Sequence, residues 1–304
     1  MKIKYTFIYL SVFILLSCQA PKNKNAQFTV VTTTTMITDL LKTIGGDAIE
    51  VQGMMGAGVD PHLYKASAGD LEKIQRADLI VYNGLHLEGK LVSVLKKMDG
   101  LGKTTLALGD FLPEAQVIHS ENFISAHDPH IWFSVENWKL ITQQLVEKLS
   151  EIIPEHQAVF LKNGTSYLAS LTKLQGQLKK QVSALPHEKR VLVTAHDAFS
   201  YFGKEFGFKV VGLQGLSTAS EAGVKDVQRL ANFIVDHQIK SVFVESSVPK
   251  RTIEALQAAV KAKGFWVEIG GELFSDALGQ PNTAEGTYIG MYKHNVKTIV
   301  EGLQ

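Results

Sequence analysis

The predicted fold depends on residues 155–185, which read EHQAVFLKNGTSYLASLTKLQGQLKKQVSAL. Apolar residues recur there at steps of four and three, the spacing of a helix with one buried face. They are Tyr167, Leu171, Leu174, Leu178, Val182 and Leu185. Pro154 and Pro186 stand where a helix can begin and where it usually stops. The pattern predicts a helix about 45 Å long, although Asn163-Gly164 could kink it.

Strand-like segments alternate with helix-like segments on both sides of this helix. The predicted strands are residues 28–32, 49–55, 79–82, 190–194, 209–213, 241–245 and 265–269. Alternation of this kind predicts an α/β fold. We expect two lobes, each a mainly parallel sheet flanked by helices, joined by one long rigid helix. The predicted divisions are a signal peptide (1–17), a lipidated cysteine with a tether (18–27), an N-terminal lobe (28–153), the linking helix (154–186) and a C-terminal lobe (187–304).

The composition excludes several kinds of function. Of 304 residues, 31 are basic and 30 acidic, so the charge offers no attractive field for nucleic acid. The hydrophobic fraction of 45% is ordinary for a globular protein large enough for two domains. A single cysteine rules out an internal disulfide and a zinc site built from thiolates. Any metal site must therefore use histidines and carboxylates. Separately, we expect the protein to be a monomer.

The N-terminus resembles a bacterial lipoprotein signal. Lys2 and Lys4 precede an apolar stretch at residues 5–16 that is too short to span a bilayer. The following Leu15-Leu16-Ser17-Cys18 is similar to a lipobox, where cleavage leaves an acylated Cys18. The alternative is an uncleaved anchor with a buried thiol. In both cases the rest of the chain is expected outside the cytoplasm, held to a bacterial membrane by lipid, either in the periplasm or on the outer face of the cell membrane.

Three histidines and one aspartate occupy loops that could meet at one place. They are His62, His130, His196 and Asp276. Three of the four come shortly after predicted strands, and ligands of parallel sheets bind beyond the carboxyl ends of the strands. A turn or core position is the alternative for each histidine. Three imidazoles and one carboxylate suit zinc, manganese or ferrous iron better than calcium or magnesium.

Two of these histidines lie in the tripeptide Asp-Pro-His. Proline stiffens the turn, so Asp60 and Asp128 could accept hydrogen bonds from loop amides or orient an imidazole. Glu245 ends an apolar predicted strand and is expected to be buried with a partner. It is a further candidate for orienting a ligand, with a plain salt bridge as the alternative.

The other histidines are weaker candidates. We expect His86 to be structural, and His127 to be a surface residue or an auxiliary ligand. The remaining five are expected to be solvated: His119, His156, His187, His237 and His294.

Six stretches together resemble the metal-binding solute receptors of ABC importers, specifically the TroA-type zinc/manganese-binding lipoproteins. They are GVDPHLY (58–64), NGLHLE (83–88), DPHIW (128–132), VTAHDAF (193–199), GLSTASE (215–221) and GELFSDA (271–277). The resemblance implies two α/β lobes joined by a long helix. Carried over position by position, it places the four metal ligands at His62, His130, His196 and Asp276.

The third ligand bears on the choice of metal. Manganese-dedicated members of the family tend to have glutamate where this chain has His196. Zinc-dedicated members often carry a histidine-rich loop before the second ligand, whereas residues 112–126 contain only His119. The physiological metal is therefore left open between zinc and manganese, with iron as a further candidate. Intrinsic affinity favours zinc over manganese.

The function expected from the resemblance is capture of one Zn²⁺ or Mn²⁺ and its delivery to the permease of an ABC importer. A surface adhesin and a zinc-dependent hydrolase are the alternatives. We do not expect an enzyme, because the chain has no His-Glu-x-x-His motif and four protein ligands would close the coordination shell.

Overall fold

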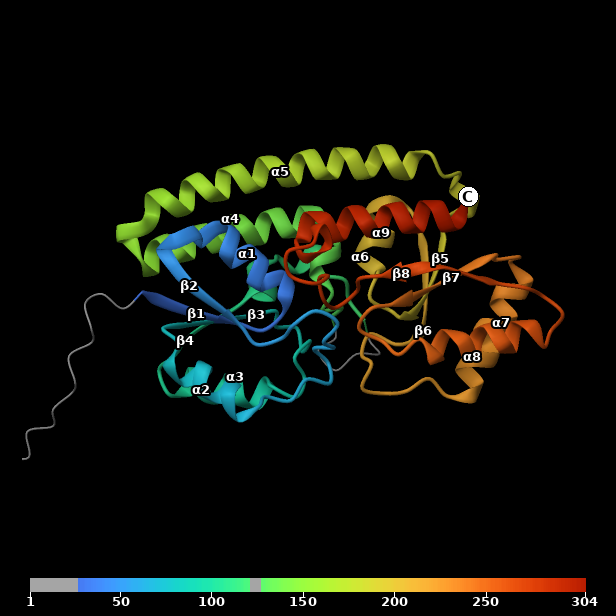
Figure 1. The fold of residues 1–304 in the computed structure, drawn as a ribbon, viewed down its shortest axis with the longest axis horizontal. Helices are drawn as coiled ribbons and strands as arrows, with labels where there is room; N and C mark the ends of the chain where they lie inside the picture. Colours follow the sequence, from blue (N-terminus) through green and yellow to red (C-terminus); the bar gives the residue numbers. More distant parts are fainter. Residues whose placement is uncertain (1–26, 121–126) are drawn as a thin grey trace, which may run out of the picture.

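The structure is a computed structural model, which describes residues 27–120 and 127–304. Two groups of parallel strands lie side by side beneath one long helix, α5 (Gln157–Ser183), which reaches across both (Figure 1). This arrangement confirms the predicted α/β class with two lobes and a linking helix. The limits given above for the two lobes stay a prediction. The predicted signal peptide, Cys18 and nearly all of the tether lie outside the described residues.

The N-terminal lobe is built on a four-stranded parallel sheet with the order β2-β1-β3-β4. Its strands are β1 (Phe28–Thr32), β2 (Ile49–Gly53), β3 (Leu79–Tyr82) and β4 (Thr104–Ala107). Its helices are α1 (Thr35–Gly45), α2 (Ala68–Arg76), α3 (Val92–Gly100) and α4 (Val135–Ile152). The sequence patterns missed β4, because its residues TTLA form no apolar run like the LIVY of the equally short β3.

The C-terminal lobe contains two pairs of parallel strands, β5 with β6 and β7 with β8. Its strands are β5 (Val191–His196), β6 (Lys209–Gln214), β7 (Ser241–Glu245) and β8 (Glu268–Leu273). Its helices are α6 (Ser200–Phe206), α7 (Val224–Asp236), α8 (Arg251–Lys261) and α9 (Tyr288–Leu303). The last strand lies further along the chain than predicted. Gly270 and Gly271 belong to it, where the pairing with β7 shifts register beside Phe243.

Helix α5 is continuous over 27 residues, as predicted, and Asn163-Gly164 does not interrupt it. Asn163 instead donates a hydrogen bond to the carbonyl of Ile44. Gly164 faces α4, where an added Cβ would lie 2.5 Å from Cγ2 of Val146. The glycine therefore permits the close approach of two helices. The apolar side of α5 that the sequence predicted is buried in the structure.

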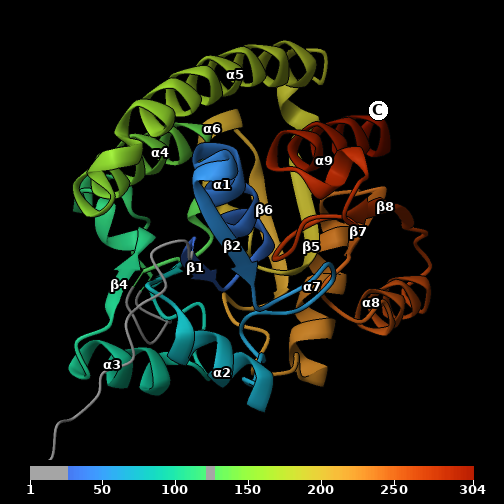
Figure 2. The same ribbon diagram turned by 60° about the vertical axis from the view of Figure 1, so that its left-hand side comes forward.

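One apolar cluster connects the two lobes on the side of α5. Helices α1, α4, α6 and α9 lie between α5 and the strands (Figure 2). Tyr288 of α9 stacks on Trp138 of α4 with ring centroids 5.0 Å apart. Phe202 of α6 packs against Tyr292 of α9 in the same cluster. The lobes are thus joined by packed side chains as well as by the chain itself.

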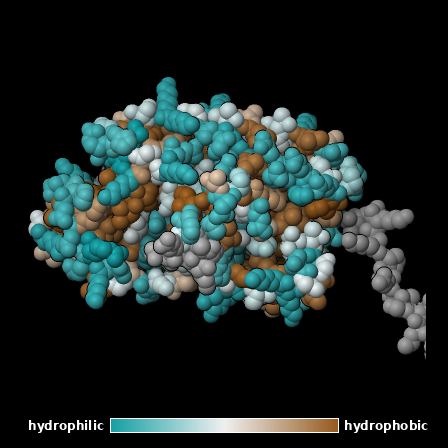
Figure 3. All heavy atoms as spheres, turned by 180° about the vertical axis from the view of Figure 1, so that it is seen from behind, coloured by the Kyte–Doolittle hydropathy of each residue, from teal (hydrophilic) through white to brown (hydrophobic). Residues whose placement is uncertain are grey.

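The outer surface is mixed in character. On the face opposite to that of Figure 1, hydrophilic side chains separate smaller hydrophobic patches (Figure 3). None of the helices in the described part of the chain has the apolar length that crossing a bilayer requires.

Candidate metal centre

Four polar side chains from distant parts of the chain meet between the lobes. His62 lies in the loop after β2, His130 precedes a short 3-10 helix at Ile131–Phe133, His196 ends β5, and Asp276 follows β8. One ligand atom from each lies within 4.8 Å of the others. All four side chains are buried, with exposed fractions of 3% or less. The parallel strands deliver three of these residues to one place, because their carboxyl ends meet there.

The spacing of the donor atoms suits a tetrahedral ion. Nε2 of His130 lies 3.4 Å from Nε2 of His62 and 3.3 Å from Nε2 of His196. Asp276 places Oδ1 3.6 Å from Nε2 of His130 and Oδ2 3.3 Å from Nε2 of His196. Donors at about 2.1 Å from a tetrahedral ion are about 3.4 Å from one another. The four side chains therefore form a cage of the right size for one transition-metal ion.

Two imidazoles are oriented by buried carboxylates. Oδ1 of Asp128 accepts hydrogen bonds from the amide and Nδ1 of His130, at 2.9 and 2.7 Å. Glu245 likewise bonds His196. Its Oε1 accepts from the amide at 2.9 Å, and its Oε2 accepts from Nδ1 at 2.5 Å. A proton on each Nδ1 leaves Nε2 with a free lone pair. Both carboxylates thus turn the imidazoles so that Nε2 faces the cage.

Asp60 bonds the backbone of His62 and not its imidazole ring. Its Oδ1 accepts a hydrogen bond of 2.8 Å from the amide of His62. Its Oδ2 accepts one of 2.5 Å from the hydroxyl of Thr218, in the loop after β6. The carboxylate therefore fixes the loop that carries His62 and ties it to the C-terminal lobe.

Burial and charge set the protonation of the centre. Burial lowers the pKa of His62 to about 3, so its imidazole is neutral at physiological pH. Burial would also lower the pKa of His196, but Glu245 and Asp276 outweigh it and hold that pKa well above its usual value. Burial opposes ionisation of Asp276 as well, yet the neighbouring His196 holds the pKa of this carboxyl below its usual range. A cation that enters the cage therefore competes with the proton on His196.

One oxygen of the cage lacks a hydrogen-bond donor. Within the described part of the chain, Oδ1 of Asp276 is buried and accepts no hydrogen bond, while Oδ2 accepts one of 3.3 Å from Ser247. A buried carboxylate oxygen without a donor is costly, and a cation would stabilise it. This unpaired oxygen lies 3.6 Å from Nε2 of His130, so an ion in the cage could bind both atoms.

The other histidines of interest lie outside the cage. Nε2 of His127 donates a hydrogen bond of 2.8 Å to Oε1 of Glu114, and the ring of His127 lies 5.7 Å from that of His119. His86 lines a cavity of about 450 Å³ together with His62. His86 adopts a left-handed φ of 66°, in a turn where Glu88 accepts hydrogen bonds from two backbone amides.

Sequence reasoning missed two residues that support the centre. They are Thr218, which holds Asp60, and Tyr201, which bonds the backbone of Asp128. Thr218 lies in GLSTASE, a stretch to which the sequence assigns no role, and Tyr201 lies outside the six stretches quoted above. Their partners are 158 and 73 residues away in the chain. Local patterns carry no signal for such contacts.

Several known proteins resemble this chain over most of its length. Residues 30–302 match the family model described as "ZnuA: Zinc-uptake complex component A periplasmic". The chain is 44% identical over 300 residues to the manganese-binding lipoprotein MntA of Bacillus subtilis strain 168, covering 98% of this chain and 97% of that protein. It is 47% identical over 274 residues to the zinc-binding protein TroA of Treponema pallidum strain Nichols, covering 90% and 88%. A solved structure of that periplasmic zinc-binding protein superposes with a TM-score of 0.89 at 46% identity, covering 91% of this chain and 99% of the other.

Proposed function

Because the chain belongs to the ZnuA family of zinc-uptake components, which its residues 30–302 match, we propose that it captures a divalent transition metal outside the cytoplasm and delivers it to an ABC importer. The cargo is Zn²⁺, Mn²⁺ or both, with Fe²⁺ as a further candidate. The similarity to a manganese-binding lipoprotein and to a zinc-binding protein supports this choice of cargo.

The proposed ligands are Nε2 of His62, His130 and His196 together with the carboxylate of Asp276. The observation that carries this assignment is the cage itself, with four donor atoms within 4.8 Å of one another and one carboxylate oxygen lacking a donor. Asp128 and Glu245 are proposed to orient two of the imidazoles, and Asp60 to fix the loop of the third.

The geometry favours capture over catalysis. Catalytic zinc sites keep one coordination position open for water or substrate. Here four protein donors would fill a tetrahedral shell, and all four side chains are buried. Such a centre holds its ion through the protein alone, which suits cargo that is bound and then passed on.

Anchoring and partners follow from the same family. We propose that Cys18 carries lipid, supported by the Leu15-Leu16-Ser17-Cys18 sequence and by relatives described as lipoproteins. The proposed partner is the membrane permease of an ABC importer, whose affinity for the loaded protein must differ from that for the metal-free protein.

Elemental analysis of protein purified from its own host tests the cargo directly. We expect close to one equivalent of zinc or manganese per chain, and competition calorimetry ranks the two metals. Cells that lack the gene should accumulate less of the same metal. Protein without stoichiometric metal, together with unchanged accumulation, would refute the proposal.

A further inference from the structure

The segment that carries His130 is hydrogen-bonded to the C-terminal lobe, although its sequence position places it in the N-terminal half. Nε1 of Trp132 donates to the carbonyl of Ser275 at 3.0 Å, next to Asp276. The hydroxyls of Tyr288 and Tyr292 on α9 donate to the carbonyls of Trp132 and Phe133, at 2.7 and 2.6 Å. Three bonds from two parts of the C-terminal lobe therefore hold the residues that follow His130.

Tyr201 holds the residues that precede His130. Its hydroxyl donates a hydrogen bond of 2.9 Å to the carbonyl of Asp128 and accepts one of 3.0 Å from the amide of Ile118. Tyr201 lies on α6, which begins four residues after His196. The side chain is buried, so loss of these bonds would leave buried polar groups without partners.

Asp128 connects this contact to the metal cage. Its carboxylate bonds both the amide and Nδ1 of His130, so the position of its backbone sets the direction in which Nε2 points. We infer that Tyr201 is a positioning residue for His130, acting through Asp128. This inference rests on the proposed metal-binding function.

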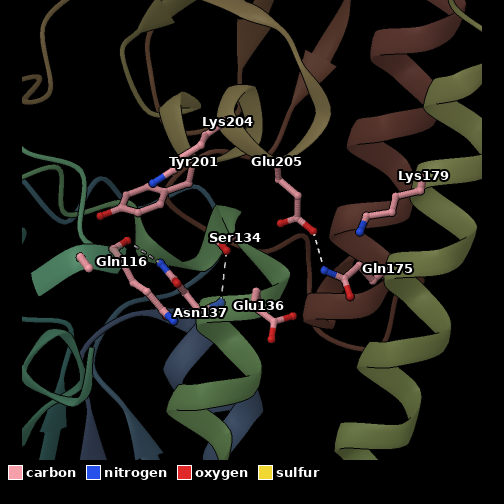
Figure 4. A pocket seen from close by; sticks show the side chains of 10 residues that line it. Gln116, Ser134, Glu136, Asn137, Gln175, Lys179, Tyr201, Lys204 and Glu205 are labelled. Carbon is pink, nitrogen blue, oxygen red and sulfur yellow. Dashed lines mark hydrogen bonds between the residues drawn. The ribbon is translucent and has the colours of Figure 1, made fainter. Parts of the chain in front are cut away.

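Glu205 extends the same contact by one turn of α6. Figure 4 shows Tyr201 and Glu205 on α6 beside the start of α4 and the side of α5. Glu205 accepts a hydrogen bond of 2.9 Å from the amide of Val135 and one of 2.8 Å from Nε2 of Gln175. Ile118, Asp128 and Val135 thereby each bond to a side chain of α6, beside a cavity of about 390 Å³.

The loop of His62 is held differently. Its bond to the C-terminal lobe runs from Thr218 to Asp60. The cavity of about 450 Å³ is lined by His62 and by none of the other three proposed ligands. The cage therefore consists of a three-ligand unit, His130, His196 and Asp276, and a separately held His62. Tyr201 is the residue that makes His130 part of that unit.

The test compares two buried tyrosines. Tyr201→Phe removes the bonds to Asp128 and Ile118, whereas Tyr167→Phe removes a buried hydroxyl on α5 that accepts only from Nε1 of Trp138 among the bonds described. We expect Tyr201→Phe to bind Zn²⁺ about tenfold more weakly and to alter the visible absorption spectrum of bound Co²⁺, which reports ligand geometry. Tyr167→Phe should match the wild type in both. Equal affinity and an unchanged spectrum in Tyr201→Phe would overturn the inference.

A double-mutant cycle separates positioning from a general loss of structure. If Tyr201 acts through Asp128, Tyr201→Phe should weaken Zn²⁺ binding little further in an Asp128→Ala background. If the loss of Zn²⁺ affinity in the double variant equals the product of the losses in the two single variants, the inference is refuted. The wild type and Tyr167→Phe serve as references for the proposed function: if neither binds Zn²⁺, it is metal capture that fails, and not the role of Tyr201.

Discussion

Oε2 of Glu245 lies 2.5 Å from Nδ1 of His196, and both side chains are fully buried. Oε1 of the same carboxylate accepts a hydrogen bond from the amide of His196. One residue at the end of β7 therefore fixes both the backbone and the ring of a residue at the end of β5.

Glu245→Gln should weaken metal binding without abolishing it. The amide keeps the shape but loses the charge that favours a proton on Nδ1 and a free Nε2 on His196. We expect an affinity loss of about 10–100-fold for Zn²⁺, measured by competition with a chelator. Glu272→Gln is the control, because Glu272 lies on the adjacent β8 and pairs with exposed Lys250. Equal affinities for the two variants would contradict the role given to Glu245.

His62→Ala and His196→Ala should each weaken metal binding more than Glu245→Gln does. The loss of affinity should therefore exceed the about 10–100-fold expected for a residue that only orients a ligand. Each removes one of four proposed donors and leaves an open shell. His119→Ala should bind as the wild type does, because its ring lies beside His127 instead of in the cage. Calorimetry with Zn²⁺ and Mn²⁺ provides the measurement. Similar behaviour of all three variants would mean that the ligand assignment is wrong.

Two glycines of α5 should respond to alanine in opposite directions. Gly164→Ala places a Cβ 2.5 Å from Val146 and should destabilise the protein by about 1–3 kcal/mol, since α4 and α5 must separate. At Gly176 no atom lies within 4 Å of the added Cβ, so Gly176→Ala should stabilise by about 0.5–1 kcal/mol through helix propensity. Urea unfolding of the metal-free variants decides between these signs. Destabilisation by both substitutions would contradict the packing described for α5.

Asp70 should contribute stability that depends on pH. Burial alone would raise the pKa of Asp70. Hydrogen bonds from Ser67 and Tyr64 outweigh burial and hold this pKa below its usual value. A lowered folded-state pKa stabilises the protein above the unfolded-state pKa of about 3.9, and this contribution is lost as the pH falls through the folded-state pKa. Asp70→Asn should therefore cost about 1–2 kcal/mol at pH 7 and progressively less below pH 4.

Urea unfolding of the metal-free protein at pH 7, 5 and 3 measures this dependence. The exposed Asp47→Asn is the control and should leave the free energy of unfolding nearly unchanged. A cost for Asp70→Asn that stays constant, or grows, toward pH 3 would contradict the assignment.

Much of the fold could be predicted from local patterns. The apolar stripe from Tyr167 to Val182 predicted α5 because a helix buried on one face repeats every 3.6 residues. The alternation of strands and helices predicted parallel sheets. The errors lie in strands whose limits depend on pairing with a neighbouring strand more than on their own sequence pattern. β4 has the sequence TTLA, which forms no apolar run, and β8 extends through two glycines that a register shift accommodates.

The cage and the carboxylates Asp60, Asp128 and Glu245 beside it were predictable in outline, whereas the two hydroxyl contacts were not. His62, His130, His196 and Asp276 stand in loops beyond strands, a position with a known physical meaning. The contacts of Tyr201 and Thr218 run to a backbone carbonyl and to a carboxylate far away in the chain. No residue type is required at such a contact beyond a hydroxyl, so the sequence offers nothing to search for.

The packing of α9 constrains the order in which this protein can fold. Tyr288 and Tyr292 belong to the cluster that also contains Trp138 and Phe133 from the first half of the chain, and their rings contact these two residues. The earlier half therefore cannot complete its interior until the last seventeen or so residues, α9 and Gln304, have been delivered. Contacts this distant in sequence make folding slow and late. The proposed location outside the cytoplasm requires export of the chain, and such a delay keeps it unfolded for longer.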